Sequence, residues 1–388
     1  MGINTFGVQL PRRIVLGDRA EEEIGAEAKG LGAKRAFVVT DETMVKIGLL
    51  EKVERPLKEV VEMEIYDKVE SEPTLDAAEK IAVVARAAKC DIVIGLGGGS
   101  VMDMAKLAAA AVTNPLQPVS AFLGANKVTN PGVSNILIPT TAGTGAEATP
   151  YALIIVEGKK KAIASPYNLA DVVLISPSFT VSMPAELTAS TGMDALAHAI
   201  EAFLSLAANP LTDSFALEAI RKIADNLETA FLHCDDRDVR LNMSIAAMLG
   251  GMAFGNAGVI AGHAAAHTFG ARYKIPHSIA TSLALPYIME YNVQEPAVKT
   301  RLAMVAREMG EDIAGLTEEE AASKAILRVK KLLEVLKLPG RLADLDVPEK
   351  DLSDLAAAMV KEKGYLIRNP RKIEHSDALT ILRRMWTG

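Results

Sequence analysis

Short apolar runs alternate with helical stretches through the first half of the chain, and this alternation constrains the fold more than any other feature. One such helical stretch spans residues 18–31. Six runs have the length and apolar character of buried strands: residues 13–16, 36–40, 91–95, 135–139, 152–156 and 172–175. Short buried strands separated by helices are typical of βαβ units and of a mainly parallel sheet.

The pattern changes after Ser182, where Ser182-Met183-Pro184 has the composition of a helix start. Clear strand signals do not recur beyond this point, and long amphipathic or alanine-rich segments predict helices at residues 210–232, 239–251, 299–309 and 318–336. A length of 388 residues suits two domains. We therefore predict an α/β domain at residues 1–184, an all-α domain at 185–388, and a ligand-binding cleft between them.

The overall composition narrows the class of protein. The formal charge is −7 without a basic tract, so nucleic acid is not an expected partner. No 18 consecutive residues are apolar, and the N-terminus lacks the order of a signal peptide, so we expect neither a membrane span nor secretion. Cys90 and Cys234 do not form a Cys-x-x-Cys pair, which argues against a thiolate metal site and favours the cytoplasm.

A glycine-rich segment follows the predicted strand at residues 91–95. The sequence DIVIGLGGGSVMDMAK at 91–106 places Gly97, Gly98, Gly99 and Ser100 between that strand and a helix. Glycines allow close approach of a ligand to the backbone, and a helix N-terminus favours phosphate. The segment matches neither the Rossmann nor the Walker pattern. A phosphate site is the favoured interpretation, and a tight structural turn is the alternative.

Two further polar features follow strand ends. Asp41 comes directly after the strand at 36–40, where a carboxylate can accept hydrogen bonds from ribose hydroxyls and would repel a 2′-phosphate. Asp41 could equally be a helix N-cap. The segment 139–145, with Thr140, Thr141 and Thr144, suits the surroundings of a nucleotide, although a Ser/Thr-rich turn is also possible.

Histidines cluster in the second half of the chain. Asp194 and His198 lie four residues apart on a predicted helix, so both side chains project from one face and could reach one ion. A buried Asp–His hydrogen bond explains this pair equally well. The segment 262–278 adds His263, His267 and His277, the last after a turn that lets the chain fold back.

Three histidines and one aspartate would form a nitrogen-rich ligand set that suits Fe²⁺ or Zn²⁺ better than Mg²⁺, Ca²⁺ or Cu⁺. Four histidines are one more than such a site needs. His267 is the candidate for proton transfer, because a residue four positions after a ligand lies beside the ion without having to bind it.

Long segments throughout the chain resemble the iron-containing (group III) alcohol dehydrogenase family. They are LPRRIVLG near the start, GLGGGSVMDMAK, IPTTAGTGAE, TGMDALAHAIEAF, GHAAAHTFGARYKIPHS, LPYIMEYN and NPR at 369–371. The resemblance implies a nucleotide-binding α/β domain followed by a helical metal-binding domain, the fold shared with dehydroquinate-synthase-like proteins. It also implies a homodimer or larger homo-oligomer.

The resemblance assigns roles to individual residues. It implies a divalent metal, with Fe²⁺ favoured and Zn²⁺ possible, bound by Asp194, His198, His263 and His277. It implies NAD near Asp41, with Gly98, Gly99 and Ser100 at the pyrophosphate and Asp103 towards the nicotinamide. The other implied cofactor-binding residues are Thr140, Thr141, Thr144 and Lys160.

Two departures from the family pattern concern the binding sites. Glu72 stands in Glu72-Pro73-Thr74 where many members have Asn, which weakens one expected cofactor contact. Tyr365 lies near the position of a family cysteine, in a segment that can border the substrate cleft. The identity of the substrate is therefore the least transferable property.

The expected activity is reversible, NAD-dependent oxidation of a primary or small alcohol or diol to an aldehyde or ketone, with the metal polarising the substrate oxygen. A lyase or cyclase on the same scaffold, using NAD transiently, is the alternative, and the Asp194-x-x-x-His198 pair argues against it. A metal-dependent hydrolase would follow if the glycine segment were only structural, and a non-enzymatic binding protein is a further alternative.

Overall fold

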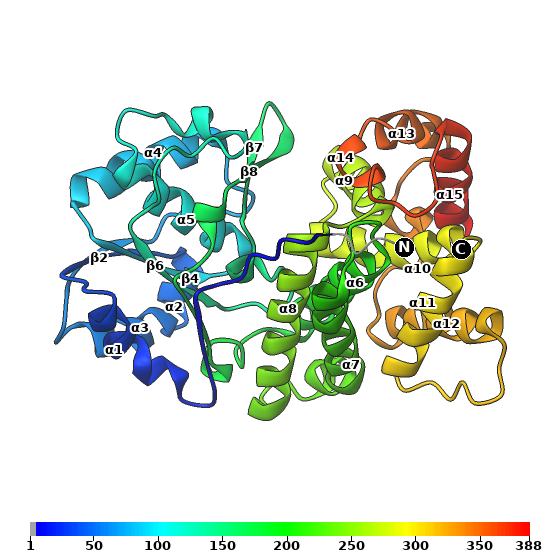
Figure 1. The fold of residues 1–388 in the computed structure, drawn as a ribbon, viewed down its shortest axis with the longest axis horizontal. Coiled ribbons are helices and arrows are strands. Elements are labelled where there is room, and N and C mark those ends of the chain that lie inside the picture. The colour runs from blue at the N-terminus through cyan, green and yellow to red at the C-terminus, as the bar shows by residue number, and fades with distance from the viewer. Residues whose placement is uncertain (1–4) are drawn as a thin grey trace. The chain divides into compact units, whose positions relative to one another are not determined.

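The computed structural model describes residues 5–388, and these residues form two compact units (Figure 1). The α/β unit is built from Gln9–Met183 with Asp235–Met248. The helical unit is built chiefly from Pro184–Cys234 and Leu249–Gly388.

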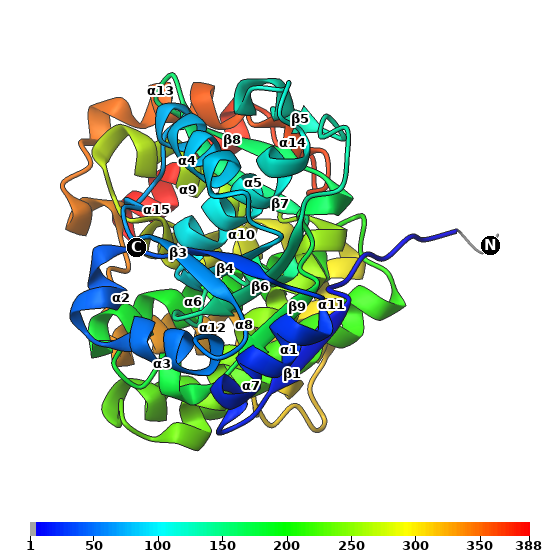
Figure 2. The ribbon, with the colours of Figure 1, turned by 90° about the vertical axis from the view of Figure 1, so that its left-hand side faces the viewer.

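A six-stranded sheet forms the centre of the α/β unit. All neighbouring strands run parallel, in the order β1-β9-β6-β4-β2-β3, and Figure 2 shows these strands side by side. Their bounds are β1 Arg13–Leu16, β2 Arg35–Val39, β3 Glu62–Tyr66, β4 Ile92–Gly97, β6 Ser134–Pro139 and β9 Val172–Ile175. The predicted parallel sheet is confirmed.

Helices cover both faces of this sheet. Figure 1 shows α4 (Leu75–Ala88) and α5 (Gly99–Thr113) on one face, and α1 (Ile24–Gly30) and α3 (Leu49–Leu57) on the other. The short helix α2 (Glu42–Lys46) follows β2. Since parallel strands are buried on both faces, the apolar side chains of β4 and β6 are fully buried.

The run at 152–156, predicted to be a strand of the mainly parallel sheet, belongs instead to a second, three-stranded sheet. There β7 (Tyr151–Val156) pairs antiparallel with β8 (Lys159–Ala164), and β5 (Gly124–Ala125) pairs with β8. Glu157 and Gly158 both have positive φ, at 51° and 72°, which allows a tight hairpin turn. This turn returns the chain beside β7 instead of sending it across the main sheet.

Two strands carry charged side chains that hid them from sequence analysis. β3 (EMEIY) is an edge strand of the main sheet, and β8 (KKKAIA) exposes lysines. Neither strand has the apolar run of a buried strand, because each is only partly covered. The predicted helix at 18–31 begins as a 3₁₀ turn, Ala20–Glu23, before α1.

The helical unit confirms the predicted change of structure after residue 182. Its longest helices are α6 (Ala185–Leu204), α7 (Pro210–Leu232) and α12 (Glu318–Val335). The others are α9 Ala261–Tyr273, α10 His277–Asn292, α11 Pro296–Glu308, α13 Leu352–Met359, α14 Lys363–Leu366 and α15 His375–Thr387. The fold class, an α/β domain followed by a helical domain, is confirmed.

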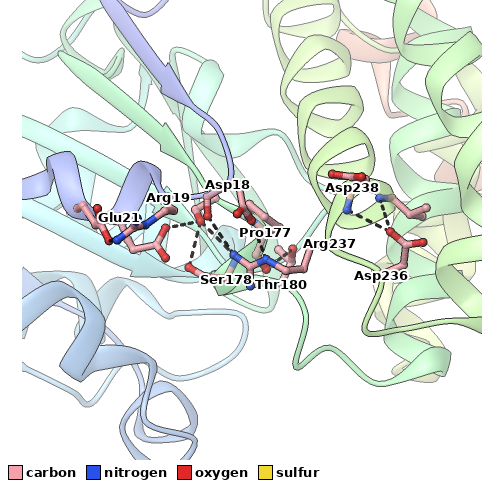
Figure 3. A network of polar contacts seen from close by, with 12 residues as sticks. Asp18, Arg19, Glu21, Pro177, Ser178, Thr180, Asp236, Arg237 and Asp238 are labelled. Carbon is pink, nitrogen blue, oxygen red and sulfur yellow. Dashed lines mark hydrogen bonds and ion pairs between the residues drawn. The ribbon is translucent and has the colours of Figure 1, made fainter.

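Helix α8 (Arg237–Ala257) starts within the α/β unit. Its first residue is held by Asp18, which accepts from Arg237 Nε at 2.6 Å and, through its carbonyl, from Nη2 at 2.9 Å (Figure 3). The Asp236 carboxylate caps the same helix end by accepting from the N–H groups of Asp238 and Val239, both at 3.1 Å. The segment before α8 is thereby fixed to the α/β unit.

Within the described residues, no single helix has the length and apolar character needed to cross a membrane. The pair α8 and α9 passes that test only when its two helices are taken together across a sharp bend.

Candidate active site

Three helices of the helical unit bring four metal-ligating side chains together. Asp194 and His198 lie on one face of α6, His263 lies in the first turn of α9, and His277 is the first residue of α10. One potential ligand atom from each residue lies within 4.8 Å of those of the other three. In a tetrahedral site, ligand bonds of about 2.0–2.2 Å place the ligand atoms roughly 3.3–3.6 Å apart. The four atoms are therefore close enough to share one ion once their side chains draw together around it.

A reversal of the chain between α9 and α10 places His277 beside His263. Lys274 ends α9 in the left-handed conformation, at φ 54°, and the N–H of Ile275 donates to the carbonyl of Gly270 at 3.0 Å. The ring centroids of His263 and His277 are consequently 5.5 Å apart. The expected turn before His277 is thus present.

The cluster is largely buried. Asp194, His198 and His263 are exposed by 1%, 6% and 3%, whereas His277 is half-buried. The His198 ring stacks on Phe254 at a centroid distance of 4.3 Å. Burial of a carboxylate is costly without a compensating charge, and a divalent cation would supply that charge.

Asp194 and His198 do not form the direct hydrogen bond that the sequence left open. Asp194 Oδ2 and His198 Nδ1 are 3.8 Å apart, beyond hydrogen-bonding distance. The other oxygen, Asp194 Oδ1, accepts a hydrogen bond from Thr281 Oγ1 at 2.7 Å. The buried Thr281 hydroxyl, from α10, thus orients the carboxylate.

Glu201 is a functional candidate that sequence analysis missed. Its Oε1 lies 2.8 Å from His263 Nδ1, and its Oε2 accepts from the Ile260 N–H at 2.7 Å. With Nδ1 engaged by Glu201, Nε2 is the nitrogen of His263 that would ligate an ion. The spacing of Asp194, His198 and Glu201, at i, i+4 and i+7, was the signal that could have revealed Glu201, because these positions share one helix face.

Gly262 makes the close approach of Glu201 possible. A Cβ at residue 262 would lie 2.2 Å from Glu201 Oε1, which is far inside van der Waals contact. A glycine is therefore required next to His263.

The glycine-rich segment connects β4 to α5 in the α/β unit, as predicted. A Cβ on Gly97 would lie 2.5 Å from Val101, and one on Gly99 would lie 2.9 Å from Thr144. Helix α5 begins at Gly99, so its first N–H groups point out of the segment. Glycine is therefore required at positions 97 and 99 by the close packing of Val101 and Thr144 against this segment.

A pocket of about 670 Å³ lies over the glycine segment. Six residues predicted from the sequence line it: Asp41, Gly98, Gly99, Ser100, Thr140 and Thr141. Asp41 also caps α2, since its Oδ1 accepts from the N–H groups of Thr43 and Met44 at 2.8 and 3.1 Å. Asp41 therefore caps α2 and also lines the pocket, so the two interpretations of this residue do not exclude each other. Asp67 and Glu70 add further acidic side chains to the wall.

Three predicted cofactor-binding residues do not line this pocket. Thr144 packs against Gly99, while Asp103 is 8% exposed in α5. Lys160 Nζ pairs with Glu72 Oε1 at 3.0 Å, and the Glu72 N–H donates to Ser100 Oγ at 3.3 Å. The departure from the family pattern at Glu72 therefore gives Lys160 an acidic partner, whereas the hydrogen bond to Ser100 comes from the backbone and does not depend on the side chain at position 72.

Lys106 is a second residue that sequence analysis missed. Its Nζ is buried and donates to the carbonyls of Ala146, Thr149 and Tyr151 at 2.5, 3.0 and 2.7 Å. Lys106 therefore fixes the segment after Thr144 to α5. The sequence offered one indication of this role: Lys106 lies three residues after Asp103 in α5, so the two charged side chains are neighbours on the helix surface.

Burial shifts the pKa values of three charged groups around Lys106. It lowers the pKa of Lys106 to about 8, raises that of Asp103 to about 6, and raises that of Glu147 to about 7. The positive charge of Lys106 opposes the shift of both carboxyl groups.

Comparison with known proteins assigns almost the whole chain to one family. Residues 11–177 match the model of the iron-containing alcohol dehydrogenases, and residues 188–386 match that of the C-terminal part of the Fe-containing alcohol dehydrogenase family. The chain belongs to the iron-containing alcohol dehydrogenase family. Membership in this family does not favour the lyase or cyclase alternative.

Individual members of the iron-containing alcohol dehydrogenase family align over nearly their full length. Long-chain-alcohol dehydrogenase 1 of Geobacillus thermodenitrificans is 36% identical over 95% of this chain and 94% of its own. The NAD-dependent methanol dehydrogenase of Bacillus methanolicus is 32% identical over 96% of this chain and 98% of its own. A crystal structure of 1,3-propanediol oxidoreductase has a TM-score of 0.94 and 36% identity, covering 99% of this chain and all of that one.

Proposed function

We propose that this protein oxidises a primary or small alcohol or diol to the corresponding aldehyde or ketone, reversibly, with NAD and one divalent metal ion. The observation that carries the proposal is the convergence of Asp194, His198, His263 and His277 from three helices. Fe²⁺ is the favoured ion because of the family, and the N3O ligand set also accommodates Zn²⁺.

When bound, the ion would lower the pKa of the alcohol hydroxyl and NAD would accept the hydride. The chain's own residues hold these groups and move the proton. The His267 ring centroid lies 5.2 Å from that of His277 and 6.4 Å from that of His263. We assign the transfer of the hydroxyl proton to His267, because it lies beside the four clustered residues without belonging to them.

We further propose that NAD binds over the glycine segment, with the pyrophosphate at Gly98, Gly99 and Ser100. The other cofactor-binding residues in this proposal are Asp41, Asp103, Thr140, Thr141, Thr144 and Lys160. Two domains, residues 1–184 and 185–388, a homodimeric or larger assembly and a cytoplasmic location complete the proposal. The proposed location rests on the sequence, in which Cys90 and Cys234 are the two cysteines and do not form a Cys-x-x-Cys pair.

The proposed activity is tested by anaerobic purification, metal analysis and a screen of alcohols, diols and aldehydes with NAD and NADP. We expect about one divalent ion per site and formation of NADH with at least one small alcohol or diol. Protein that binds both NAD and metal but oxidises none of these substrates, and reduces no aldehyde, would refute the proposed activity.

Replacement of Asp41 by Asn should shift the cofactor preference towards NADP. Asn keeps the N-cap of α2 but removes the negative charge that would repel a 2′-phosphate. We expect the ratio of kcat/KM for NADP to that for NAD to rise about tenfold, equivalent to about 1.4 kcal/mol. Asp76→Asn, at an exposed site of α4, is the control. An unchanged ratio in Asp41→Asn would show that this carboxylate does not select the cofactor.

Replacement of Glu201 by Gln should weaken retention of the metal. Gln keeps the volume, but its amide group cannot accept hydrogen bonds at both the His263 ring and the Ile260 N–H as the carboxylate does. Loss of such a partner typically costs about 10- to 100-fold in metal affinity. Metal release to a chelator measures the effect, with Glu218→Gln on the surface of α7 as control. Equal release from both variants would contradict a role for Glu201.

A further inference from the structure

Tyr365 lies directly beside the histidine to which we assign proton transfer. The tyrosine belongs to α14, which packs against α9. Its hydroxyl oxygen lies 3.2 Å from His267 Nδ1. The two rings meet edge to face, with an interplanar angle of 88° and centroids 5.1 Å apart. A half-buried tyrosine therefore contacts His267 through both its ring and its hydroxyl group.

The segment that carries Tyr365 is held firmly in the helical unit. Asn369 and Asn292 form a reciprocal pair of amide hydrogen bonds, at 2.8 and 3.0 Å, in the buried interior. Asn369 Oδ1 also accepts from the N–H of Ala261, the first residue of α9, at 3.4 Å. The Arg368 carbonyl accepts from the Leu206 N–H at 2.9 Å. The Tyr365 hydroxyl is thus presented to His267 by a fixed backbone.

The ring of Tyr365 also lies near the four candidate metal ligands. The centroid of the Tyr365 ring lies 6.5 Å from that of His263, and His267 lies 5.2 Å from His277. Tyr365 is therefore adjacent to the cluster, while the residue it hydrogen bonds is His267.

A tyrosine hydroxyl can both donate and accept a hydrogen bond, and this matters for a histidine that transfers protons. Towards neutral His267, the hydroxyl donates to Nδ1, which leaves the ring proton on Nε2. Towards protonated His267, the hydroxyl accepts from Nδ1–H. The same contact therefore holds the imidazole in one orientation in both of its states and keeps Nε2 as the nitrogen that exchanges the proton.

We propose that Tyr365 is a positioning residue that orients His267 for proton transfer through its hydroxyl group. The inference rests on the proposed function, because it needs His267 to act in proton transfer. No covalent step is added: one proton is exchanged at His267 Nε2, and the tyrosine keeps its own.

A double-mutant cycle tests the proposal with Tyr365→Phe, His267→Ala and the double variant. Phenylalanine keeps the ring contact and removes only the hydroxyl. For Tyr365→Phe we expect kcat/KM for the alcohol to fall about three- to tenfold, the scale of one hydrogen bond. Metal content and the Kd for NAD, measured by calorimetry, should not change. In the His267→Ala background, the same substitution should change kcat/KM by less than about twofold, because the partner is gone.

Tyr273→Phe provides the matched control. This tyrosine is the last residue of α9, and its hydroxyl donates to Asp351 Oδ2 at 2.6 Å, away from the histidine cluster. Its removal should leave kcat/KM unchanged.

The possible results separate the positioning role from the assigned role of His267. If Tyr365→Phe has the same effect in both backgrounds, or no effect in either, the positioning role is refuted while the proposed function stands. If His267→Ala itself leaves kcat/KM unchanged, the assignment of His267 fails, and the role of Tyr365 fails with it. Metal loss from Tyr365→Phe would indicate a structural role and would also overturn the proposal.

Discussion

Replacement of His263 by alanine should yield protein that retains less than about a tenth of the bound metal and loses at least about 1,000-fold in kcat for alcohol oxidation. The substitution removes one of the four clustered candidate ligands, and it also removes the ring to which Glu201 is hydrogen bonded. Metal analysis of anaerobically purified protein and the rate of NADH formation measure the two effects.

The matched control for this variant is His375→Ala. His375 is an exposed histidine at the start of α15, where its ring nitrogen Nε2 lies 3.3 Å from the Ser353 carbonyl. Its replacement should preserve both metal and activity. The Kd for NAD should also be preserved in His263→Ala, because the glycine segment lies in the α/β unit. Full metal content together with full activity in His263→Ala would overturn the ligand assignment.

Replacement of Lys106 by methionine should lower the free energy of unfolding by about 3–5 kcal/mol, the scale on which removing one member of a buried ionic cluster destabilises a protein. Methionine has a similar shape but cannot donate to the carbonyls of Ala146, Thr149 and Tyr151. The segment after Thr144 would lose its attachment to α5, so we also expect weaker NAD binding. Chemical denaturation and calorimetry measure these effects, with the exposed Lys80→Met in α4 as control.

The destabilisation caused by Lys106→Met should grow between pH 6 and pH 8. The pKa values of Asp103 and Glu147 are already raised to about 6 and about 7, and the charge of Lys106 holds them below still higher values. A carboxyl group with a raised pKa in the folded state loses stability as the pH rises through that pKa. Removing Lys106 raises both pKa values further and deepens this loss. Destabilisation that is independent of pH would show that the charge of Lys106 does not matter.

Much of the fold could be predicted because the relevant patterns are local. Helix α7 has the bounds expected from periodicity, and α12 ends one residue earlier than expected. The run at 152–156 was correctly identified as a strand but was placed in the wrong sheet. Its partner β8 is rich in lysine, and the turn at Glu157 and Gly158 brings this strand back to pair with β7. Strand pairing depends on contacts that periodicity does not encode.

In the candidate metal site, too, local spacing predicted part of the arrangement and contacts between separate helices decided the rest. Helical spacing brought Asp194 and His198 to one face, and the chain reversal after α9 made His277 a plausible neighbour of His263. Spacing alone could not decide between an ion site and an Asp–His hydrogen bond. The 3.8 Å separation of that pair and the convergence of four ligand atoms favour the ion site.

The sequence by itself determined which residues are candidate ligands, which of them share a helix face, and where the glycine segment lies between a strand and a helix. These features depend on neighbours within a few turns of the same element. Only the tertiary structure decided which side chains orient the candidate ligands and His267. Glu201 meets His263 across 62 residues, Thr281 meets Asp194 across 87, and Tyr365 meets His267 across 98. Such contacts arise when separate helices pack together, and the chemistry of a polar side chain does not indicate which distant partner it will meet.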